Sequence, residues 1–512
     1  MSAIRHALNV KREDDFAAWY QEVVSAADMA EESGVRGCMV IKPWGYGIWE
    51  RMQRLLDQRI KAAGVQNAYF PLFIPLSNFV REAAHVEGFA KEMAVVTHHR
   101  LIADGKGGLI PDPEAKLEEP LIVRPTSETI IGDAMSRWVQ SWRDLPLLTN
   151  QWANVVRWEM RTRMFLRTSE FLWQEGHTAH ETREDALKET MRALEMYRAF
   201  AEEDVALPVI AGEKPENERF PGAVGTWSIE AMMQDGKALQ AGTSHYLGTS
   251  FAEAANIRFQ DREGGQQLAH TTSWGVSTRM VGALIMTHGD DDGLRVPPAL
   301  APQQVVILPM LRDNDGDEAL LAYCDALRAS IAVKSALDEK IRVLLDARPG
   351  KAAAKRWDWV RRGAPVIVEV GPRDMEAGTV SLLRRDALWG ADGKPAFQAP
   401  ARDAVAEAIG PLLEEIQAGL FSEARARREE NIARADSFEA LADHFGEDRR
   451  YPGWVEVQWS RPTGAALEAV TERLKALKLT FRNVALDAEP ADGTCVFTGE
   501  PAVERIYVAR AY

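Results

Sequence analysis

Hydrophobic and polar positions follow a helical period in the N-terminal part of the chain. Residues 14–33 gather their aromatic side chains on one side of an amphipathic helix, and residues 48–63 repeat the spacing. After Gly64, an apolar run at residues 67–75 has strand character and includes Pro71. Because proline is tolerated in edge strands, we predict that this strand lies at the edge of a sheet.

The same patterns predict further loops, strands and helices up to residue 287. We expect a loop at 104–119, a short strand and a capped helix within 121–139, a helix at 180–204, a loop at 214–225, strands and turns within 229–248, a strand at 251–260 and a helix at 272–287.

A hairpin is predicted between residues 154 and 180. Apolar runs flank a polar turn, which is typical of two paired strands and their connection. The turn contains Arg157, Arg161, Arg163 and Arg167. Their guanidinium groups would repel one another unless a polyanion lies between them, and their planar shape suits phosphate oxygens. Taken alone, the pattern is also that of a solvated hairpin on the surface.

The proline-rich residues 294–302 mark a domain boundary. Beyond it, strands alternate with helices, which implies a small α/β domain with a mostly parallel sheet. A charged helix at 413–433 then leads to a last unit. The expected order in the middle domain is strand 304–309, helix 317–337, strand 341–345, basic helix near 351–361 and strand 366–370.

Composition limits the protein class without revealing a function. A chain of 512 residues exceeds one ordinary core, so two to four domains are expected, and 46% hydrophobic with 27% charged residues is typical of soluble globular proteins. No apolar run is long enough to cross a membrane, and no secretory signal is visible. Three widely spaced cysteines favour a reducing compartment, the cytoplasm. The net charge of −15 argues against non-specific coating of nucleic acid, but a local basic face remains possible.

The hairpin carries a family resemblance. Arg-Trp-Glu from Arg157, followed by Phe-Leu-Arg-Thr and Phe-Leu-Trp-Gln-Glu-Gly-His, resembles motif 2 of the class II aminoacyl-tRNA synthetases and, in detail, the prolyl-tRNA synthetases. Gly-Val-Ser-Thr-Arg-Met-Val-Gly from Gly275 resembles motif 3. The helix at 48–63 and the strand with Pro71 resemble motif 1, which forms the dimer interface in that family.

The resemblance covers nearly the whole chain and implies an α/β and α+β multidomain protein. Three units are expected: a class II antiparallel-sheet catalytic core at 1–296, an α/β anticodon-binding domain at 297–405, and a linker helix with a small α+β C-terminal domain at 406–512. The implied activity is that of a proline–tRNA ligase, which forms prolyl-adenylate from L-proline and ATP and transfers the prolyl group to tRNA(Pro).

This chemistry needs no covalent enzyme nucleophile. It depends on positioning two anions and neutralising the charge that develops on phosphorus, with Mg²⁺ on the phosphates. By the resemblance, Arg157 bridges the substrate carboxylate and the α-phosphate, and Arg279 contacts the γ-phosphate; both are the expected catalytic residues. Phe171 is expected to stack on adenine, although a core aromatic is an equal alternative. The implied ATP-binding residues are Arg157, Glu159, Arg167, Thr168, Phe171, Gln240, Thr243, Ser277 and Arg279.

The proline site is implied by Arg-Pro-Thr-Ser-Glu-Thr from Arg124, in which Thr126 and Glu128 hold the secondary ammonium. A carboxylate is required there because a buried ammonium without an anionic partner is costly. A helix capping box explains only the start of the following helix. Phe89 and Glu92 match a mobile loop that closes over the substrate. The implied proline-binding residues are Thr126, Glu128, Arg157, Trp173, Glu175, His177, His245 and Phe89. The His-x-x-His formed by His177 and His180 shows only two ligands, so no metal is expected there.

The sequence departs from the family pattern in two places. The interval from Arg167 to Gln240 is too short for the editing domain of the bacterial type, so the archaeal and eukaryotic type is indicated. Of the four zinc-binding cysteines that family members often carry, Cys495 remains while Thr498 stands three residues later, so no structural zinc is expected. The packing of Trp454, Trp459, Phe481 and Phe497 would then support this domain. The terminal Tyr512 resembles a residue that reaches toward the active site in the family.

Partners follow from the resemblance as well. tRNA(Pro), L-proline, ATP and a second copy of the chain in a homodimer are expected, and no membrane. Glu369 and Arg373 are the candidates for reading the anticodon, although Ile367 replaces an expected arginine. Threonyl-, glycyl- and histidyl-type enzymes are rivals within the class. A non-catalytic paralogue that binds tRNA is a rival outside it, but such chains usually lose the motif 2 or motif 3 arginine.

Overall fold

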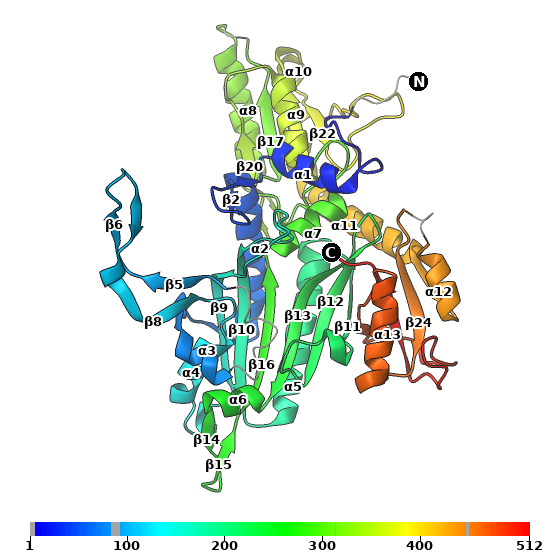
Figure 1. Ribbon diagram of the computed structural model, residues 1–512. Helices are drawn as coiled ribbons and strands as arrows, with labels where there is room; N and C mark the ends of the chain where they lie inside the picture. Colours follow the sequence, from blue (N-terminus) through cyan, green and yellow to red (C-terminus); the bar gives the residue numbers. More distant parts are fainter. Residues whose placement is uncertain (1–5, 83–92, 313, 447–449) are drawn as a thin grey trace.

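The computed structural model describes residues 6–82, 93–312, 314–446 and 450–512. An eight-stranded sheet in the order β26-β11-β12-β13-β16-β10-β9-β3 forms its centre (Figure 1). All neighbouring strands are antiparallel except β3 and β9. The strands are β3 Gln66–Asn67, β9 Leu147–Val156, β10 Glu170–His180, β11 Val209–Glu213, β12 Gly225–Met232, β13 Ala238–Gly248, β16 His270–Ser277 and β26 Val484–Ala485.

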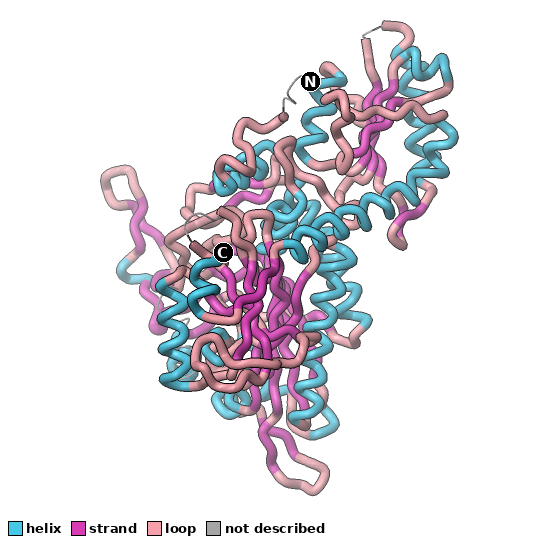
Figure 2. The backbone as a smooth tube through the Cα atoms, turned by 90° about the vertical axis from the view of Figure 1, so that its right-hand side faces the viewer, coloured by secondary structure: helices cyan, strands magenta, loops and turns pink. Residues whose placement is uncertain are grey.

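One face of this sheet is covered by α5, Arg183–Ala199, which packs across β13 and β16. Gln174 of β10 points to this face, where its side-chain oxygen accepts a hydrogen bond from the Tyr197 hydroxyl at 2.6 Å. Successive side chains of a strand point to opposite faces, so Trp173, Glu175 and His177 point to the other face. Figure 2 shows helices on both sides of the central strands.

The N-terminal helices pack against the other elements of this core. They are α1 Phe16–Ala26 and α2 Pro43–Ala62, with a small hairpin of β1 Ala30–Glu32 and β2 Met39–Ile41 between them. The helix α7, Arg279–His288, is buried along its length and contacts α1. Apolar side chains from α1, α2, α7 and the sheet form one continuous core.

A three-stranded sheet lies beside the centre and carries a projecting arm. Its order is β4-β8-β5, and the hairpin of β6 and β7 extends away from it (Figure 1). The bounds are β4 Phe73–Pro75, β5 Val95–His98, β6 Leu101–Ala103, β7 Leu109–Pro111 and β8 Lys116–Val123, with helices α3 Leu76–Glu82, α4 Glu128–Trp138 and α6 Ser250–Ala255 nearby.

A second unit has the predicted mostly parallel sheet, in the order β20-β17-β21-β22 with only β22 antiparallel. Its elements are β17 Val305–Pro309, α8 Asp317–Ala332, β20 Val343–Leu345, α9 Ala352–Arg362, β21 Val366–Val370, α10 Pro372–Ala377 and β22 Ser381–Arg384. The long helix α11, Arg402–Glu430, then leads to the C-terminal part.

The C-terminal part forms a four-stranded sheet in the order β23-β24-β27-β25 with its own apolar core. Its elements are β23 Ile432–Ala435, α12 Phe438–His444, β24 Trp454–Trp459, α13 Gly464–Ala476, β25 Thr480–Phe481 and β27 Glu504–Ala509. Between β25 and β27 the chain contributes β26 to the edge of the central sheet.

Several predicted elements differ from the structure. The predicted helix at 272–287 is wrong in its first part, because residues up to Ser277 form the central strand β16 and α7 begins at Arg279. The predicted strand at 251–260 is mostly wrong, because α6 occupies its start and ends at Ala255, followed by Asn256 with a left-handed φ of 58°. Short buried apolar runs fit either structure, so their periodicity could not decide between them.

Other boundaries shift by a few residues or more. The helix predicted at 14–33 ends at Ala26, where Asp28 adopts a positive φ of 57° and a strand follows. The loop predicted at 104–119 contains β7 and the start of β8, and the helix predicted at 413–433 begins already at Arg402. None of the helices in the described part of the chain combines the length and apolar character that crossing a bilayer requires.

Candidate active site

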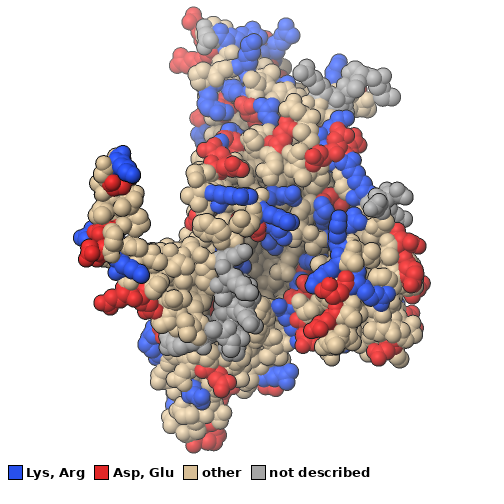
Figure 3. Space-filling view, viewed as in Figure 1, with Lys and Arg blue, Asp and Glu red and all other residues tan. Residues whose placement is uncertain are grey.

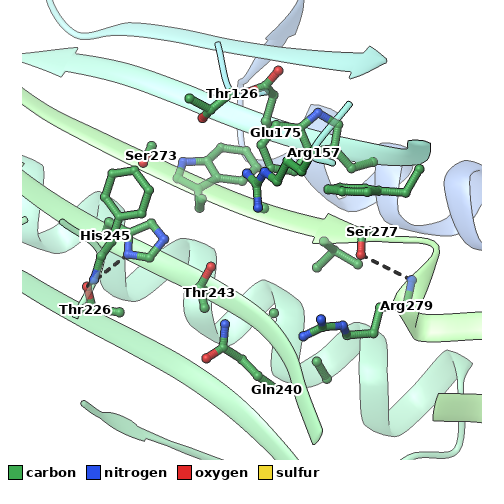
Figure 4. A pocket seen from close by; sticks show the side chains of 18 of the residues that line it. Thr126, Arg157, Glu175, Thr226, Gln240, Thr243, His245, Ser273, Ser277 and Arg279 are labelled. Atoms are coloured by element: carbon green, nitrogen blue, oxygen red, sulfur yellow. Dashed lines mark hydrogen bonds between the residues drawn. The ribbon is translucent and has the colours of Figure 1, made fainter. Parts of the chain in front are cut away.

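A cavity of about 770 Å³ opens on the sheet face opposite α5 (Figure 4). It brings together the predicted ATP and proline residues that lie within the described part of the chain. These are Thr126, Glu128, Arg157, Glu159, Arg167, Thr168, Phe171, Trp173, Glu175, His177, Gln240, Thr243, His245, Ser277 and Arg279. Phe89 and Glu92, the predicted closing loop, lie outside the described residues.

Strand register accounts for this convergence of distant residues. Glu175 on β10 lies opposite Gly275 on β16, and Gly275 lies opposite Thr243 on β13. Gly275 carries no side chain, so the middle of this row stays open. In the next row on the same face, His177 lies opposite Ser273, which in turn lies opposite His245.

The acidic side of the cavity is built around Glu175. This carboxylate accepts hydrogen bonds at 2.5 Å from both Ser127 Oγ and Gln151 Nε2, and pairs with His177 Nε2 at 2.8 Å. Burial alone would lower the pKa of His177, but Glu175 outweighs it and raises that pKa. Next to this network, the Thr126 hydroxyl donates to Glu128.

The capping-box alternative fails at this point. Ser127 stands at the N-cap position of α4, but its side chain makes no cap hydrogen bond and donates to Glu175 instead. The serine therefore serves the cavity network.

The basic end of the cavity contains Arg157, Arg167 and Arg279. Arg157 donates from Nε to Pro125 O at 2.8 Å, and Arg279 donates from Nε to Leu166 O at 3.3 Å. Burial lowers the pKa of Arg279, and the charges of Arg167 and Arg157 lower it further. Because the two neighbouring guanidinium groups disfavour the charge on Arg279, a bound polyanion would stabilise this end of the cavity.

The loop between β9 and β10 is held by the N-terminal segment. Tyr20 donates its hydroxyl proton to Met164 O at 2.8 Å, and Gly37 O accepts from Ser169 N at 2.7 Å. Gly37 has a φ of +80°, and a Cβ there would lie 2.4 Å from Ser169 Oγ, so this close approach requires glycine. The predicted hairpin is confirmed, with Trp173 opposite Ala153 in its register.

The sequence left two alternatives for Phe171, a ring that stacks on adenine or an aromatic of the core. It lines the cavity and is only partly buried, with its ring 6.0 Å from that of Trp173 and under the Arg157 guanidinium at 5.5 Å. A ring in this position faces the cavity and is not part of the apolar core.

Sequence reasoning missed several lining residues, among them Glu218, Phe220, Thr226 and Ser273. Thr226 Oγ1 lies 3.0 Å from His245 Nδ1, and the Phe220 ring centroid lies 4.8 Å from that of His245. Burial lowers the pKa of His245 to about 3, with help from the charges of His177 and Lys214, so the ring is neutral at pH 7. No motif marks these residues: Thr226 and Ser273 are placed by cross-strand register with His245, and Glu218 and Phe220 lie in the segment that precedes β12.

The His-x-x-His pair is separated by the sheet. His177 bonds Glu175 on the cavity face, whereas His180 Nδ1 lies 2.6 Å from Asp185 on the α5 side. Residues three apart on a strand point to opposite faces, so the two rings do not meet. Among the described residues, no group of three or more His, Cys, Asp or Glu side chains could hold a metal ion.

Glu369 is buried in the second unit, and both its oxygens lie 3.0 Å from Arg356 Nη1 on α9. Burial raises the pKa of this carboxyl group, and Arg356 opposes the shift. Ile367, which stands where the resemblance expects an arginine, is fully buried. Arg373, at the start of α10, is exposed.

In the C-terminal unit, Cys495 is buried and Ser460 Oγ lies 3.0 Å from Thr498 Oγ1. Trp459, Phe481 and Phe497 pack together with ring centroids 4.6 to 5.7 Å apart, whereas Trp454 packs toward the central sheet. The terminal Tyr512 donates its hydroxyl proton to Asp235 at 2.6 Å, and its ring lies 5.8 Å from the Arg163 guanidinium.

Comparisons with known proteins agree with this geometry. Residues 113–288 match a family model described as the tRNA synthetase class II core domain (G, H, P, S and T), and residues 304–389 match one described as an anticodon binding domain. The chain is 73% identical over 514 residues to a proline–tRNA ligase of Erythrobacter litoralis, with 100% of both chains covered. It is 72% identical over 511 residues to that of Novosphingobium aromaticivorans, covering 100% of this chain and 99% of the relative.

A solved structure shares the whole fold. It is the prolyl-tRNA synthetase from Cryptosporidium parvum complexed with halofuginone and AMPPNP, with a TM-score of 0.89, 34% sequence identity and 100% of both chains covered.

Proposed function

The chain belongs to the prolyl-tRNA synthetases of class II, and from this premise we infer how its cavity performs the reaction. The protein is a proline–tRNA ligase that charges tRNA with proline and uses ATP as a substrate. In the first step a proline carboxylate oxygen attacks the α-phosphorus, and pyrophosphate leaves. In the second, a hydroxyl of the tRNA 3′ end attacks the prolyl carbonyl carbon, and AMP leaves.

Proline binds at the acidic side of the cavity. Glu128, with Thr126 beside it, accepts the secondary ammonium, and Trp173 and His245 enclose the ring. The Glu175–His177 pair sits behind this site and fixes its walls. This assignment is supported by the lining of one cavity that contains both Glu128 and the buried Glu175, because an ammonium taken out of water needs an anionic partner.

ATP binds at the basic end. Arg157 bridges the proline carboxylate and the α-phosphate, while Arg279 and Arg167 hold the outer phosphates with Thr168 and Ser277. Phe171 stacks on adenine, with Glu159, Gln240 and Thr243 at the edges of the nucleotide. The repulsion that Arg167 and Arg157 exert on Arg279 in the free site supports the assignment, because a triphosphate would relieve it.

Mg²⁺ completes the nucleotide site. The described residues of the cavity offer four carboxylates, Glu128, Glu159, Glu175 and Glu218, of which only Glu159 lies on the arginine-rich loop. A magnesium ion held mainly by phosphates and one carboxylate fits such a donor set. When bound, it neutralises phosphate charge; the arginines do the remaining work of holding the leaving pyrophosphate.

We assign the chain to three functional units. Residues 1–296 form the catalytic unit, 297–405 the anticodon-binding unit and 406–512 the linker helix with the C-terminal unit. Glu369 and Arg373 are assigned to anticodon contact, with Arg356 holding Glu369. Lys and Arg side chains across the middle of the face in Figure 3 offer a surface for the tRNA phosphates.

The protein acts as a homodimer in the cytoplasm. Support for a dimer comes from exposed apolar side chains around the motif 1 strand and on the β6–β7 arm, where Tyr69 is 74%, Leu101 58% and Leu109 69% exposed. An isolated two-stranded hairpin is marginally stable in water, so a partner surface would stabilise this arm. The free cysteines and the role in protein synthesis support the cytoplasm.

The observation that carries the proposal is one cavity with an acidic side and a basic end of three arginines. Amino-acid-dependent exchange of pyrophosphate into ATP tests it. Purified protein should support exchange with proline and be nearly silent with threonine, glycine and histidine. Exchange that no amino acid stimulates would instead favour a tRNA-binding protein without activity.

Alanine is the most informative alternative substrate in this assay. The interval from Arg167 to Gln240 lies wholly within the described residues and is made of strands of the central sheet and the helices that connect them. Since lost methylene contacts give only about 1–3 kcal/mol of discrimination each, alanine should be activated measurably. Alanyl-tRNA should persist when made by this chain; its rapid hydrolysis by the same protein would contradict the assignment of the editing-free type.

A further inference from the structure

A buried cluster of charges joins the C-terminal unit to the central sheet. Glu230 on β12 is fully buried, and its Oε2 accepts hydrogen bonds from Arg482 at 3.1 Å (Nε) and 2.5 Å (Nη2). Its Oε1 lies 3.1 Å from Lys214 Nζ and accepts from Ser228 Oγ at 3.0 Å. The carboxyl group of Glu218 also interacts with Lys214 and Arg482, so Arg482 supplies one of the two cations that balance the acidic groups here.

The cluster lies on the cavity face of β12. Thr226, Ser228 and Glu230 alternate along the strand, so they point to one face, and Thr226 lines the cavity. Across the sheet, Glu230 is the register partner of Gln240, a residue of the nucleotide end. The charges of Glu230 and Arg482 both act on Arg279.

The C-terminal unit reaches this position through a strand. β26 pairs with β11, and Asn483 Nδ2 donates to Ile210 O at 2.9 Å. At Gly212 a Cβ would lie 2.2 Å from Val484 O, so only glycine permits this approach of the two backbones. Arg482, next to these residues, is thereby inserted beside the cavity, and its Nη1 is held by Thr480 Oγ1 at 2.9 Å.

A carboxylate without full compensation would repel a triphosphate here. Burial tends to raise the pKa of Glu230, but Arg482 and Lys214 outweigh it and lower the pKa to about 2, so the group is ionised at pH 7. Inside a protein such a charge acts over longer distances than in water. Its neutralisation therefore matters to any polyanion bound near Gln240 and Arg279.

We propose that Arg482, from the C-terminal unit, is a positioning residue for ATP: by pairing with Glu230 it keeps the nucleotide end of the cavity cationic. The C-terminal unit is then part of the activation site. This inference rests on the proposed assignment of Gln240 and Arg279 to ATP.

A series of variants that differ in charge at positions 482 and 230 tests the proposal in pyrophosphate exchange at pH 7. Arg482→Gln removes one positive charge and should raise KM for ATP about five- to tenfold, with KM for proline changed less than about twofold. Adding Glu230→Gln in the same chain restores the net charge and should return KM for ATP to within about twofold of wild type. Arg482→Lys keeps the charge and should remain near wild type.

Arg505→Gln is the matched control. Arg505 is also buried, but it pairs with Asp492 at 2.9 Å within the C-terminal unit and not with the central sheet. Its removal should leave KM for ATP unchanged, and thermal melting curves should show folded protein for all variants compared.

A merely structural role of Arg482 predicts the opposite pattern. The proposal is overturned if the double variant binds ATP as poorly as Arg482→Gln or worse, or if both KM values rise together. If Arg482→Gln does not fold, Glu230→Gln alone decides: KM for ATP at or below wild type supports the proposal, and a rise overturns it. Arg279→Ala distinguishes a failure of this proposal from a failure of the proposed function. An unchanged KM for ATP in that variant would contradict the assignment of Arg279 to ATP, on which the proposed function depends.

Discussion

Arg157 occupies the junction between the acidic and basic sides of the cavity. Its Nε is held by Pro125 O, and its guanidinium lies 5.4 Å from the centre of the Trp173 ring. A planar guanidinium can serve two substrate oxygens at once, which the point charge of a lysine cannot do.

Replacing Arg157 with lysine should lower kcat for proline-dependent exchange about 10²- to 10³-fold, because a preorganised donor to the developing charge is lost. Arg161→Lys on the same loop is the control, since Arg161 is exposed and does not line the cavity. Its exchange rate should match wild type. Equal loss in both variants, or none in either, would contradict the role given to Arg157.

His288 should make the fold acid-sensitive. It is buried at the end of α7, where Nε2 lies 3.0 Å from Val205 O, and burial, then Arg295, lowers its pKa to about 3. The unfolded chain binds this proton near pH 6.5 and the folded chain near 3. The unfolded state therefore binds more protons between these values, and stability falls as the pH falls through this window.

His288→Gln should flatten that dependence by up to about 1.4 kcal/mol per pH unit between pH 6 and 4, measured as the free energy of unfolding in urea at a series of pH values. A variant with the same slope as wild type would show that His288 titrates normally in the folded state. His245 titrates in the same window, so a residual slope is expected.

At the scale of elements, Gly212 permits the close approach of β11 and β26. Gly212→Ala should separate these strands, because its Cβ would overlap Val484 O at 2.2 Å. We expect a lower melting temperature and faster proteolysis between α11 and the C-terminal unit. Gly419→Ala in α11 is the control: no atom lies within 4 Å of its Cβ, and alanine favours helices by up to about 1 kcal/mol. If both variants melt alike, strand β26 is not an important link.

The sequence predicted long and punctuated elements well and short buried ones poorly. The hairpin of β9 and β10 and the alternation from β17 to β21 were predictable, because turn residues and prolines separate them. Strand β16 was mistaken for helix, since its run of His, Thr, Ser and Trp is buried on both faces and has no clear period. The packing of its two neighbours decides that it is a strand.

The prediction of the cavity residues shows the same division, because residues in local motifs could be predicted and residues placed by strand register could not. Residues inside motifs, such as Arg157 and Glu128, were found by resemblance, and the structure places them in one cavity. Ser273 and Thr226 were missed because they owe their position to register with His245, which no local pattern encodes. Arg356 lies in the basic helix that the sequence predicted, but its contact with Glu369 on a neighbouring strand could not be predicted from local pattern.

At the scale of the whole molecule, the β6–β7 arm should hold two copies together. Leu101→Lys with Leu109→Lys places charges on its most exposed apolar positions and should shift the protein from dimer toward monomer in sedimentation velocity. Val333→Lys, at a 65% exposed position after α8, should leave the dimer intact. A wild-type protein that is monomeric at micromolar concentration would contradict the dimer directly.

A crystal structure of the chain with a non-hydrolysable prolyl-adenylate analogue tests the central claim most directly. The account predicts the prolyl nitrogen within hydrogen-bond distance of Glu128 and Thr126, the phosphate-mimicking group on Arg157, and the adenine against Phe171. An analogue bound with its ends reversed, or outside the cavity that these residues line, would contradict it.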